Sequence, residues 1–209
     1  MPHPFDQHRY QVRVEWGAAG LARLAGADIV VVVDVLRFST TVTDAVARGD
    51  SVAMAELHAV SINGAAVTAA AVGREPAPLV LLGCLRNATA VARAVLAEQQ
   101  RRGARTSIAV IACGEFGAGE PRFAVEDQLG AGAIIDALAA LGLDHSSPEA
   151  AGAGEAFRGL RGGLRHLLAA SGSGQELIER GLHDEVLCAA ELDATSTVPV
   201  LCGGVFKAL

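Results

Sequence analysis

Five consecutive β-branched residues, Ile29 to Val33, limit the folds open to this chain more than any other segment. Such a run is typical of a β-strand that is buried on both faces. Polar residues follow directly: Asp34, then Arg37, then three hydroxyl residues at 39–41. Because an unpaired charge is costly to bury, this cluster indicates a ligand, a metal or an internal partner. Open α/β sheets bind their ligands at the carboxyl ends of their strands, which is where these residues stand.

Two further apolar segments repeat this arrangement of a strand followed by polar residues. They are Leu79–Leu82, followed by Arg86 and Asn87, and Ser107–Ala112, followed after a glycine-rich loop by Glu126 and Asp127. A predicted helix follows each strand, and this order implies parallel pairing through right-handed crossovers. We therefore expect an α/β fold with a mostly parallel sheet and helices on both faces. In such a sheet the three polar clusters lie on one rim.

The other expected elements follow from periodicity and from turn residues. We expect strands at 12–16 and 51–57, a β-like segment at 198–201, and helices at 40–48, 88–102, 125–142, 164–169 and 175–181. Asn63-Gly64 indicates a turn before an Ala-rich helix that ends near Val72. The Gly-, Ser- and Ala-rich segment 144–163 is typical of a linker or mobile region. We divide the chain into an α/β core at 1–145 and a C-terminal portion at 146–209 that packs on the same core.

Composition and charge exclude several classes of function. The chain has 209 residues, 51% of them hydrophobic, and a net charge of −6, with no basic stripe to neutralise nucleic-acid phosphates. Arg101, Arg102 and Arg105 cluster at a predicted helix end, where cations suit the helix dipole. The apolar runs are too short to span a bilayer, and we expect a cytoplasmic protein that does not bind membranes. The four cysteines show no metal-ligand spacing and are expected to be reduced thiols.

The predicted rim combines groups that suit an anion and a divalent cation. Arg37 and Arg86 lie beside helix N-termini, and guanidinium groups bind phosphate or sulfonate in bidentate fashion. The carboxylates of Asp34, Glu126 and Asp127 suit Mg²⁺, which prefers oxygen ligands. The sequence thus predicts a site for a small anionic, phosphate-bearing molecule.

Structural roles for the same residues stay open. Asp34 and Arg37 can simply pair with each other, and acidic residues at 126 and 127 are favoured in the first turn of any helix. Asn87, and either Ser39 or Thr40, are natural helix caps. A cysteine phosphatase is disfavoured because no cysteine begins a Cys-x5-Arg loop. An aspartyl-phosphate enzyme of the haloacid dehalogenase type is disfavoured because position 36 is Leu rather than a second Asp.

Several motifs together resemble the 2-phosphosulfolactate phosphatase family. The similar segments are Asp34–Thr41, Gly83–Ala92, Cys113-Gly114 with Arg122–Asp127, Gly130–Gly132, Ser171–Gly181 and Val198–Val200. The resemblance implies this family's fold and a Mg²⁺-dependent hydrolysis of 2-phosphosulfolactate to sulfolactate and phosphate, a step of coenzyme M biosynthesis. A homodimer is compatible with it.

The resemblance also implies roles for individual residues. Asp34 is expected to ligate the metal or to act as nucleophile, and Glu126 and Asp127 to serve as metal ligands or as a water-positioning base. Arg37 and Arg86 are expected to hold the phosphoryl oxygens. The expected substrate-binding set is Arg37, Ser39, Thr40, Asn63, Gly64, Arg86 and Asn87.

The chain departs from the family pattern near Asn63-Gly64. A Gly-rich segment that the family carries before this pair is missing, and Ile62 and Ala65 replace its flanking threonines. These departures favour an alternative function, namely a degenerate family member that binds a small anion without turnover.

Overall fold

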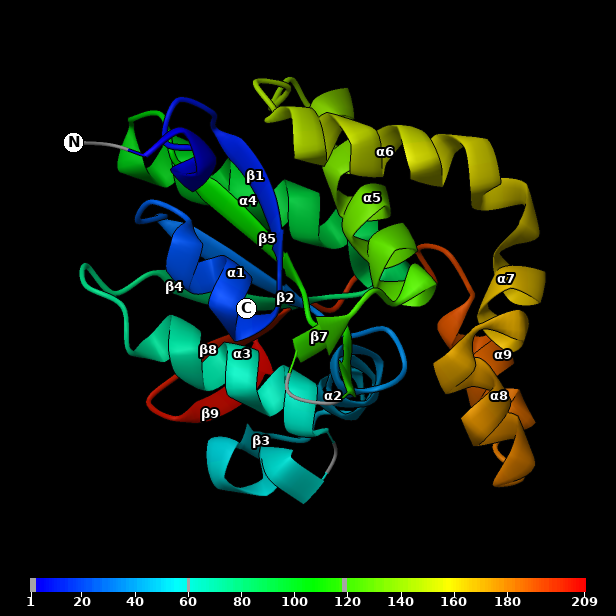
Figure 1. Ribbon diagram of the computed structural model, residues 1–209. Helices are drawn as coiled ribbons and strands as arrows, with labels where there is room; N and C mark the ends of the chain where they lie inside the picture. The colour runs from blue at the N-terminus through cyan, green and yellow to red at the C-terminus, as the bar shows by residue number, and fades with distance from the viewer. Residues whose placement is uncertain (1–2, 60, 118–119) are drawn as a thin grey trace.

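The computed structural model describes residues 3–59, 61–117 and 120–209 and is built around one mixed sheet (Figure 1). Seven strands form it in the order β1-β5-β2-β4-β8-β9-β3. The first four are parallel: β1 (Val12–Trp16), β5 (Ile108–Ala112), β2 (Ile29–Val33) and β4 (Leu79–Gly83). The last three pair antiparallel: β8 (Pro199–Cys202), β9 (Val205–Ala208) and β3 (Val52–Ala53). The α/β class with a mostly parallel central sheet is confirmed.

Helices follow the parallel strands as expected. They are α1 (Gly17–Arg23) after β1, α2 (Phe38–Ala47) and α3 (Ile62–Val72) after β2, α4 (Ala88–Arg102) after β4, and α5 (Val125–Ala140) after β5. Next come α6 (Pro148–Leu160), α7 (Leu164–Ala170), α8 (Gly172–Glu179) and α9 (His183–Ala189), on the right of Figure 1. The five helices expected at 40–48, 88–102, 125–142, 164–169 and 175–181 are all present, with ends shifted by a few residues.

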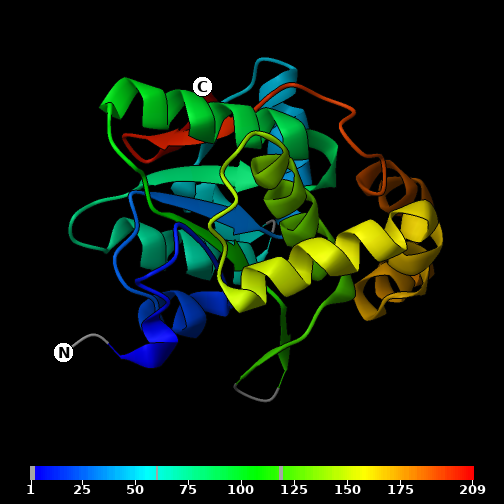
Figure 2. The ribbon, with the colours of Figure 1, turned by 90° about the horizontal axis from the view of Figure 1, so that it is seen from above.

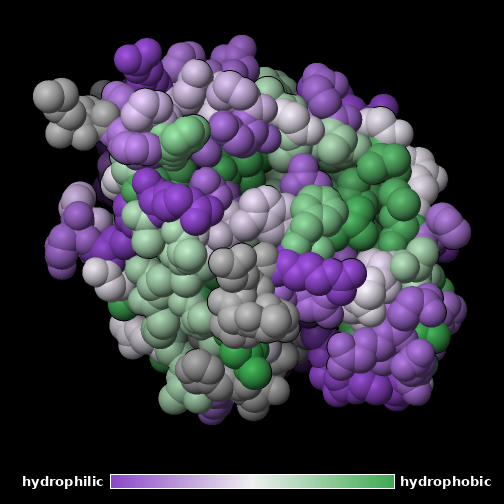
Figure 3. Space-filling model, viewed as in Figure 1, coloured by the Kyte–Doolittle hydropathy of each residue, from purple (hydrophilic) through white to green (hydrophobic). Residues whose placement is uncertain are grey.

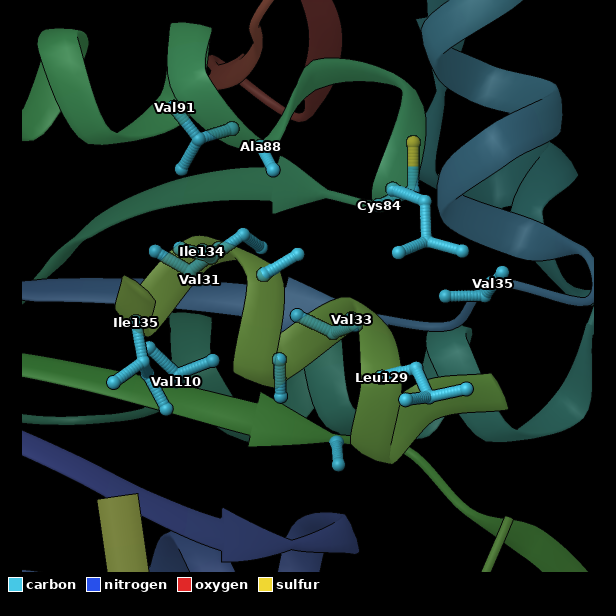
Figure 4. Packing of buried hydrophobic residues seen from close by; sticks show 14 of the residues in the cluster. Val31, Val33, Val35, Cys84, Ala88, Val91, Val110, Leu129, Ile134 and Ile135 are labelled. Atoms are coloured by element: carbon cyan, nitrogen blue, oxygen red, sulfur yellow. The ribbon is translucent and has the colours of Figure 1, made fainter. Parts of the chain in front are cut away.

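Strand β2 is fully buried, as its β-branched run predicts. Its side chains alternate between two clusters of apolar residues. Val31 packs in one cluster with Val91 of α4 and Ile134 of α5 (Figure 4). Val32 belongs to the other, together with Phe38 of α2. Figure 2, in which the molecule is seen from above, shows α6 (yellow) against α5.

The carboxyl ends of the three central strands lie level with one another. Val33 pairs in register with Gly83 of β4 and with Ala112 of β5. The polar segments that follow β2, β4 and β5 therefore leave the sheet from one rim, which confirms the prediction made from their order.

The segment at 51–57, predicted to be a strand, is mostly a 3-10 helix. Only Val52 and Ala53 pair with another strand, β9, and a 3-10 helix follows from Met54 to Ala59. The prediction is wrong because these two residues occupy the outer edge of the sheet, where no further strand of the described chain extends the pairing.

Asn63-Gly64 lies in the first turn of α3 rather than in a loop. Ser61 caps this helix, because its Oγ accepts the N–H of Gly64 at 3.3 Å. A Cβ at position 64 would lie 2.3 Å from Cδ1 of Phe38. Glycine is thus required here by a close approach to α2 and not by a turn.

The Gly- and Ala-rich segment at 144–163 is mostly helix α6 and not a linker. Ser147 caps it by accepting the N–H of Ala150, and Pro148 occupies its first position. A Cβ at Gly132 of α5 would lie 2.3 Å from the carbonyl oxygen of Ala153. The small residues therefore serve close helix packing, which composition alone does not distinguish from flexibility.

The C-terminal portion contacts the core at several places. α6 packs on α5 and β1, and β8 pairs with β4. A hairpin of β6 (Glu115–Gly117) and β7 (Glu120–Arg122) occupies the expected glycine-rich loop. The domain division at residue 145 stays a prediction. In the described part of the chain no helix is both long and apolar enough to cross a bilayer.

Candidate active site

A cleft of about 470 Å³ opens at the carboxyl rim of the parallel strands. Its lining comes from the loops after β2 and β5, from the first turns of α3 and α5, and from α8. Figure 3 shows hydrophilic surface at the lower right, where Figure 1 places α8 and α9. Asp34, Arg37, Asn63, Glu126 and Asp127, all expected site residues, line this cleft.

Asp34 is buried at the end of β2, with hydrogen bonds to both carboxylate oxygens. Oδ1 accepts the N–H of Phe38 at 3.0 Å, and Oδ2 accepts the hydroxyl of Ser61 at 2.8 Å. Burial raises the pKa of Asp34, as does the nearby Glu126 carboxylate, against the opposing effect of these hydrogen bonds. The carboxylate is thus fixed in orientation while its charge is disfavoured by its surroundings.

Asp127 joins two strand ends through the backbone. Its Oδ1 accepts the N–H of Val35 at 2.7 Å and its Oδ2 accepts the N–H of Gly114 at 2.9 Å. Burial raises the pKa of Asp127 well above its usual value, and Asp34 and Glu126 act in the same direction. Because both oxygens already bind backbone groups, Asp127 fixes the loops that follow β2 and β5.

Glu126 and Asn63 present oxygens that lack donors within the described chain. Glu126 is 2% exposed and lines the cleft, and among the described residues its carboxylate accepts no hydrogen bond. Oδ1 of Asn63 is buried without a hydrogen-bond partner in the same part of the chain. The buried amide oxygen of Asn63 requires a compensating partner, and the Glu126 carboxylate in the cleft lining is available to one. A bound cation or a donor group of a ligand can provide it.

Acidic side chains outnumber basic ones in the cleft. Five carboxylates line it, from Asp34, Glu115, Glu126, Asp127 and Glu176, against two guanidinium groups, from Arg37 and Arg180. Arg37 forms an ion pair with Glu185 of α9 and does not pair with Asp34. A dianionic ligand would therefore meet net repulsion in this cleft unless a cation entered with it.

Arg86 and Asn87 do not line the cleft, although both belong to the expected set. Arg86 donates to Asp44 of α2 at 3.1 Å, to Glu191 at 2.7 Å and to the carbonyl of Cys188 at 2.9 Å. It thereby joins α2 to the end of α9. The buried Asn87 accepts the N–H of Cys84 and donates to backbone carbonyls, so it stabilises the 3-10 turn after β4.

The remaining expected residues have internal contacts. The hydroxyl of Ser39 donates to the carbonyl of Val32, and that of Thr40 to the carbonyl of Val35. Both therefore shape the loop between β2 and α2. Gly64 is buried against Phe38, as described above.

Sequence reasoning missed several residues of the cleft. Ser61 was identifiable as a helix cap, because it stands three residues before Gly64 at the start of an Ala-rich helix. Ser173, Glu176 and Arg180 of the α8 segment share one helix face by their spacing. Nothing in the sequence indicates that this face meets the sheet rim.

The donor set does not form a closed protein cage for a metal. Within residues 3–59, 61–117 and 120–209, no group of three or more His, Cys, Asp or Glu is arranged to hold a metal ion. Mg²⁺ is often bound by only one or two carboxylates together with water and substrate phosphate. Asp34, Glu126 and the amide oxygen of Asn63 fit that smaller demand, because the oxygens of the last two have no other partner among the described residues.

The sequence profile of the 2-phosphosulpholactate phosphatase family matches residues 50–204, well over half of the chain. The chain belongs to this family. A probable 2-phosphosulfolactate phosphatase of Gloeobacter violaceus (strain ATCC 29082 / PCC 7421) is 33% identical over 123 residues, which are 59% of this chain and 47% of that protein. The matched part of the chain thus spans about half the length of this curated relative.

The match to the 2-phosphosulpholactate phosphatase family covers only part of the cleft. Asn63, Glu126, Asp127 and Arg180 lie inside the matched residues, whereas Asp34 precedes them. The sheet nevertheless brings Asp34 to the same cleft as the residues within the family match.

Proposed function

We propose that this chain hydrolyses a small phosphate monoester with the help of Mg²⁺, and that 2-phosphosulfolactate is its substrate. The proposal depends above all on one observation: buried Asp34 and Glu126 line one cleft together with Arg37. Membership of the 2-phosphosulpholactate phosphatase family supports the choice of reaction and of substrate. A cytoplasmic location, a homodimer and a place in coenzyme M biosynthesis stay predictions from the sequence.

The charge of the cleft supports the requirement for a cation. A phosphate monoester is a dianion near neutral pH, and the carboxylates of the cleft outnumber its guanidinium groups. In our proposal Asp34, Glu126 and the amide oxygen of Asn63 hold Mg²⁺. The bound ion would offset the charge of the phosphoryl group.

The protein's own residues bind and orient the ester. Arg37, three residues after Asp34, binds phosphoryl oxygens, which requires that it leave Glu185. Its guanidinium then stabilises the charge that develops in the transition state. Asp127 acts as a positioning residue, since it holds the loops after β2 and β5 in place.

The direct test is release of phosphate from 2-phosphosulfolactate by the purified protein, with Mg²⁺ and with excess EDTA. We expect hydrolysis that stops in EDTA and that Asp34→Asn abolishes. Asp50→Asn, at an exposed acid beyond the C-terminal end of α2 and outside the cleft lining, is the matched control and should keep full activity. Phosphate release at the same rate in EDTA would contradict the role of the metal. Full activity of Asp34→Asn would show that Asp34 has no role in hydrolysis.

A second function follows from the same test. If the protein releases no phosphate but binds 2-phosphosulfolactate saturably in calorimetry, its function is the binding of a small anion without turnover. The missing Gly-rich segment before α3 is the observation that favours this alternative.

A further inference from the structure

Arg180 is the second guanidinium group of the cleft and comes from outside the sheet rim. It directly follows α8, whereas Asp34, Asn63 and Glu126 come from the end of β2 and from the first turns of α3 and α5. The cleft therefore has a carboxylate-rich side at the sheet and a cationic group on its helical side.

The present partner of Arg180 is weak. Its Nη1 lies 3.5 Å from Oε1 of Glu176, four residues earlier, and both side chains are more than half exposed. Exposed pairs of this kind contribute little, because water and side-chain entropy oppose them. Arg86 shows the contrast, since its side chain is 13% exposed and is held by Asp44 and Glu191. Arg180 is consequently available to a ligand, and Arg86 is not.

Apolar side chains lie in the same cleft as the charged groups. Leu36, Ile62 and Leu177 line it together with Arg180. A cavity of about 470 Å³ suits a small molecule whose carbon skeleton contacts these side chains. With the phosphoryl group at Asp34 and Arg37, the guanidinium of Arg180 is left for another acidic group of the same molecule.

We propose that Arg180 recognises a second acidic group, carboxylate or sulfonate, carried by the phosphate ester. This inference rests on the proposed phosphatase function and adds a specificity-determining residue to it. Guanidinium binds either group through two parallel hydrogen bonds, so the chemistry is the same for both. Arg180 acts on the binding of the substrate and is not a catalytic residue, so its loss should change KM far more than kcat.

The test compares three esters: 2-phosphosulfolactate, 2-phospholactate, which lacks the sulfonate, and p-nitrophenyl phosphate, which has no second acidic group. For Arg180→Ala, we expect kcat/KM for 2-phosphosulfolactate to fall at least about tenfold relative to that for p-nitrophenyl phosphate, mainly through KM. Arg180→Lys should restore part of the loss. Arg93→Ala, at an exposed position of α4, is the matched control and should leave the ratio unchanged.

The 2-phospholactate arm identifies the recognised group. If Arg180→Ala lowers kcat/KM for 2-phospholactate as much as for 2-phosphosulfolactate, Arg180 binds the carboxylate. If kcat/KM for 2-phospholactate does not fall, Arg180 binds the sulfonate. The proposal is overturned if Arg180→Ala keeps the wild-type ratio of kcat/KM for both acidic esters relative to p-nitrophenyl phosphate. It is also overturned if kcat/KM falls by the same factor for all three esters.

A binding measurement separates this proposal from the phosphatase function. Calorimetry with sulfolactate and Mg²⁺ is run on wild type and Arg180→Ala. If the wild type hydrolyses no ester but binds sulfolactate, and Arg180→Ala weakens that binding, catalysis is refuted and the subsite stands. If the wild type neither hydrolyses an ester nor binds sulfolactate, both proposals are refuted.

Discussion

The hydroxyl of Ser61 donates to Oδ2 of Asp34 at 2.8 Å, while the hydroxyl oxygen accepts the N–H of Gly64. One side chain thus caps α3 and orients the buried carboxylate at the end of β2. The start of α3 and the acidic side of the cleft are therefore coupled through a single atom.

We predict that Ser61→Ala impairs both roles. Loss of the cap should lower the free energy of unfolding by about 1 kcal/mol, measured by urea denaturation. Loss of the hydrogen bond to Asp34 should weaken Mg²⁺ binding about 10- to 100-fold, measured by calorimetry. Ser147→Ala removes the equivalent cap of α6 and should reproduce only the first effect. Equal Mg²⁺ affinities for the two variants would refute the coupling.

Glu126 and Asp127 are adjacent, and we predict opposite effects of neutralising them. Glu126→Gln removes a buried charge without donors among the described residues, so it should raise the free energy of unfolding in EDTA and abolish stabilisation by Mg²⁺. Asp127→Asn turns an NH₂ group toward a backbone N–H and should lower stability by about 1–3 kcal/mol. Urea denaturation with and without Mg²⁺ measures both. Destabilisation of similar size in the two variants would contradict this division of roles.

Gly64→Ala should be destabilising because the added methyl group collides with the ring of Phe38. The new Cβ would approach that ring to 2.3 Å, and overpacking of this kind costs about 1–3 kcal/mol. Gly152→Ala is the control, since no described atom outside its own helix turn lies within 4 Å of a Cβ at this position of α6. That change should stabilise the protein by about 0.5–1 kcal/mol. Thermal denaturation of both variants is the measurement, and a Gly64→Ala protein as stable as the wild type would refute the packing argument.

The cysteines should differ sharply in reactivity. Cys84 and Cys113 are buried, and burial raises the pKa of both thiols, so they stay protonated at pH 8. Cys202 is exposed. Iodoacetamide on the folded protein, followed by peptide mass spectrometry, should label Cys202 and spare Cys84 and Cys113. Rapid labelling of Cys113 would contradict the burial of this thiol at the end of β5.

Much of the sheet could be predicted from sequence, because burial on both faces leaves an unambiguous apolar run. The sequence identifies two central strands as apolar runs, Ile29–Val33 and Leu79–Leu82. Their parallel pairing follows from the helices between them. Segments with weaker local signals are harder to interpret. The small residues of 144–163 serve close packing between α5 and α6, which depends on a partner helix and not on local preference.

The candidate site was predictable where polar residues stand at the end of a buried strand or at the start of the helix that follows it. Asp34, Glu126 and Asp127 meet in the cleft because their strands or helices begin and end at one rim. Arg86 also follows a strand, but its partners Asp44 and Glu191 lie 42 and 105 residues away in sequence. The contribution of α8 and Arg180 to the cleft could not be predicted for the same reason, since only tertiary packing brings that helix to the rim.

The antiparallel pairing of β8 with β4, seen between Val200 and Leu81, has a consequence for synthesis of the protein. β4 leaves the ribosome long before β8, so its apolar edge stays open until the residues from Pro199 onward are made. Open edges of this kind recruit strands from other molecules. We therefore expect chains that stop before Pro199 to accumulate in inclusion bodies, whereas the full chain stays in solution.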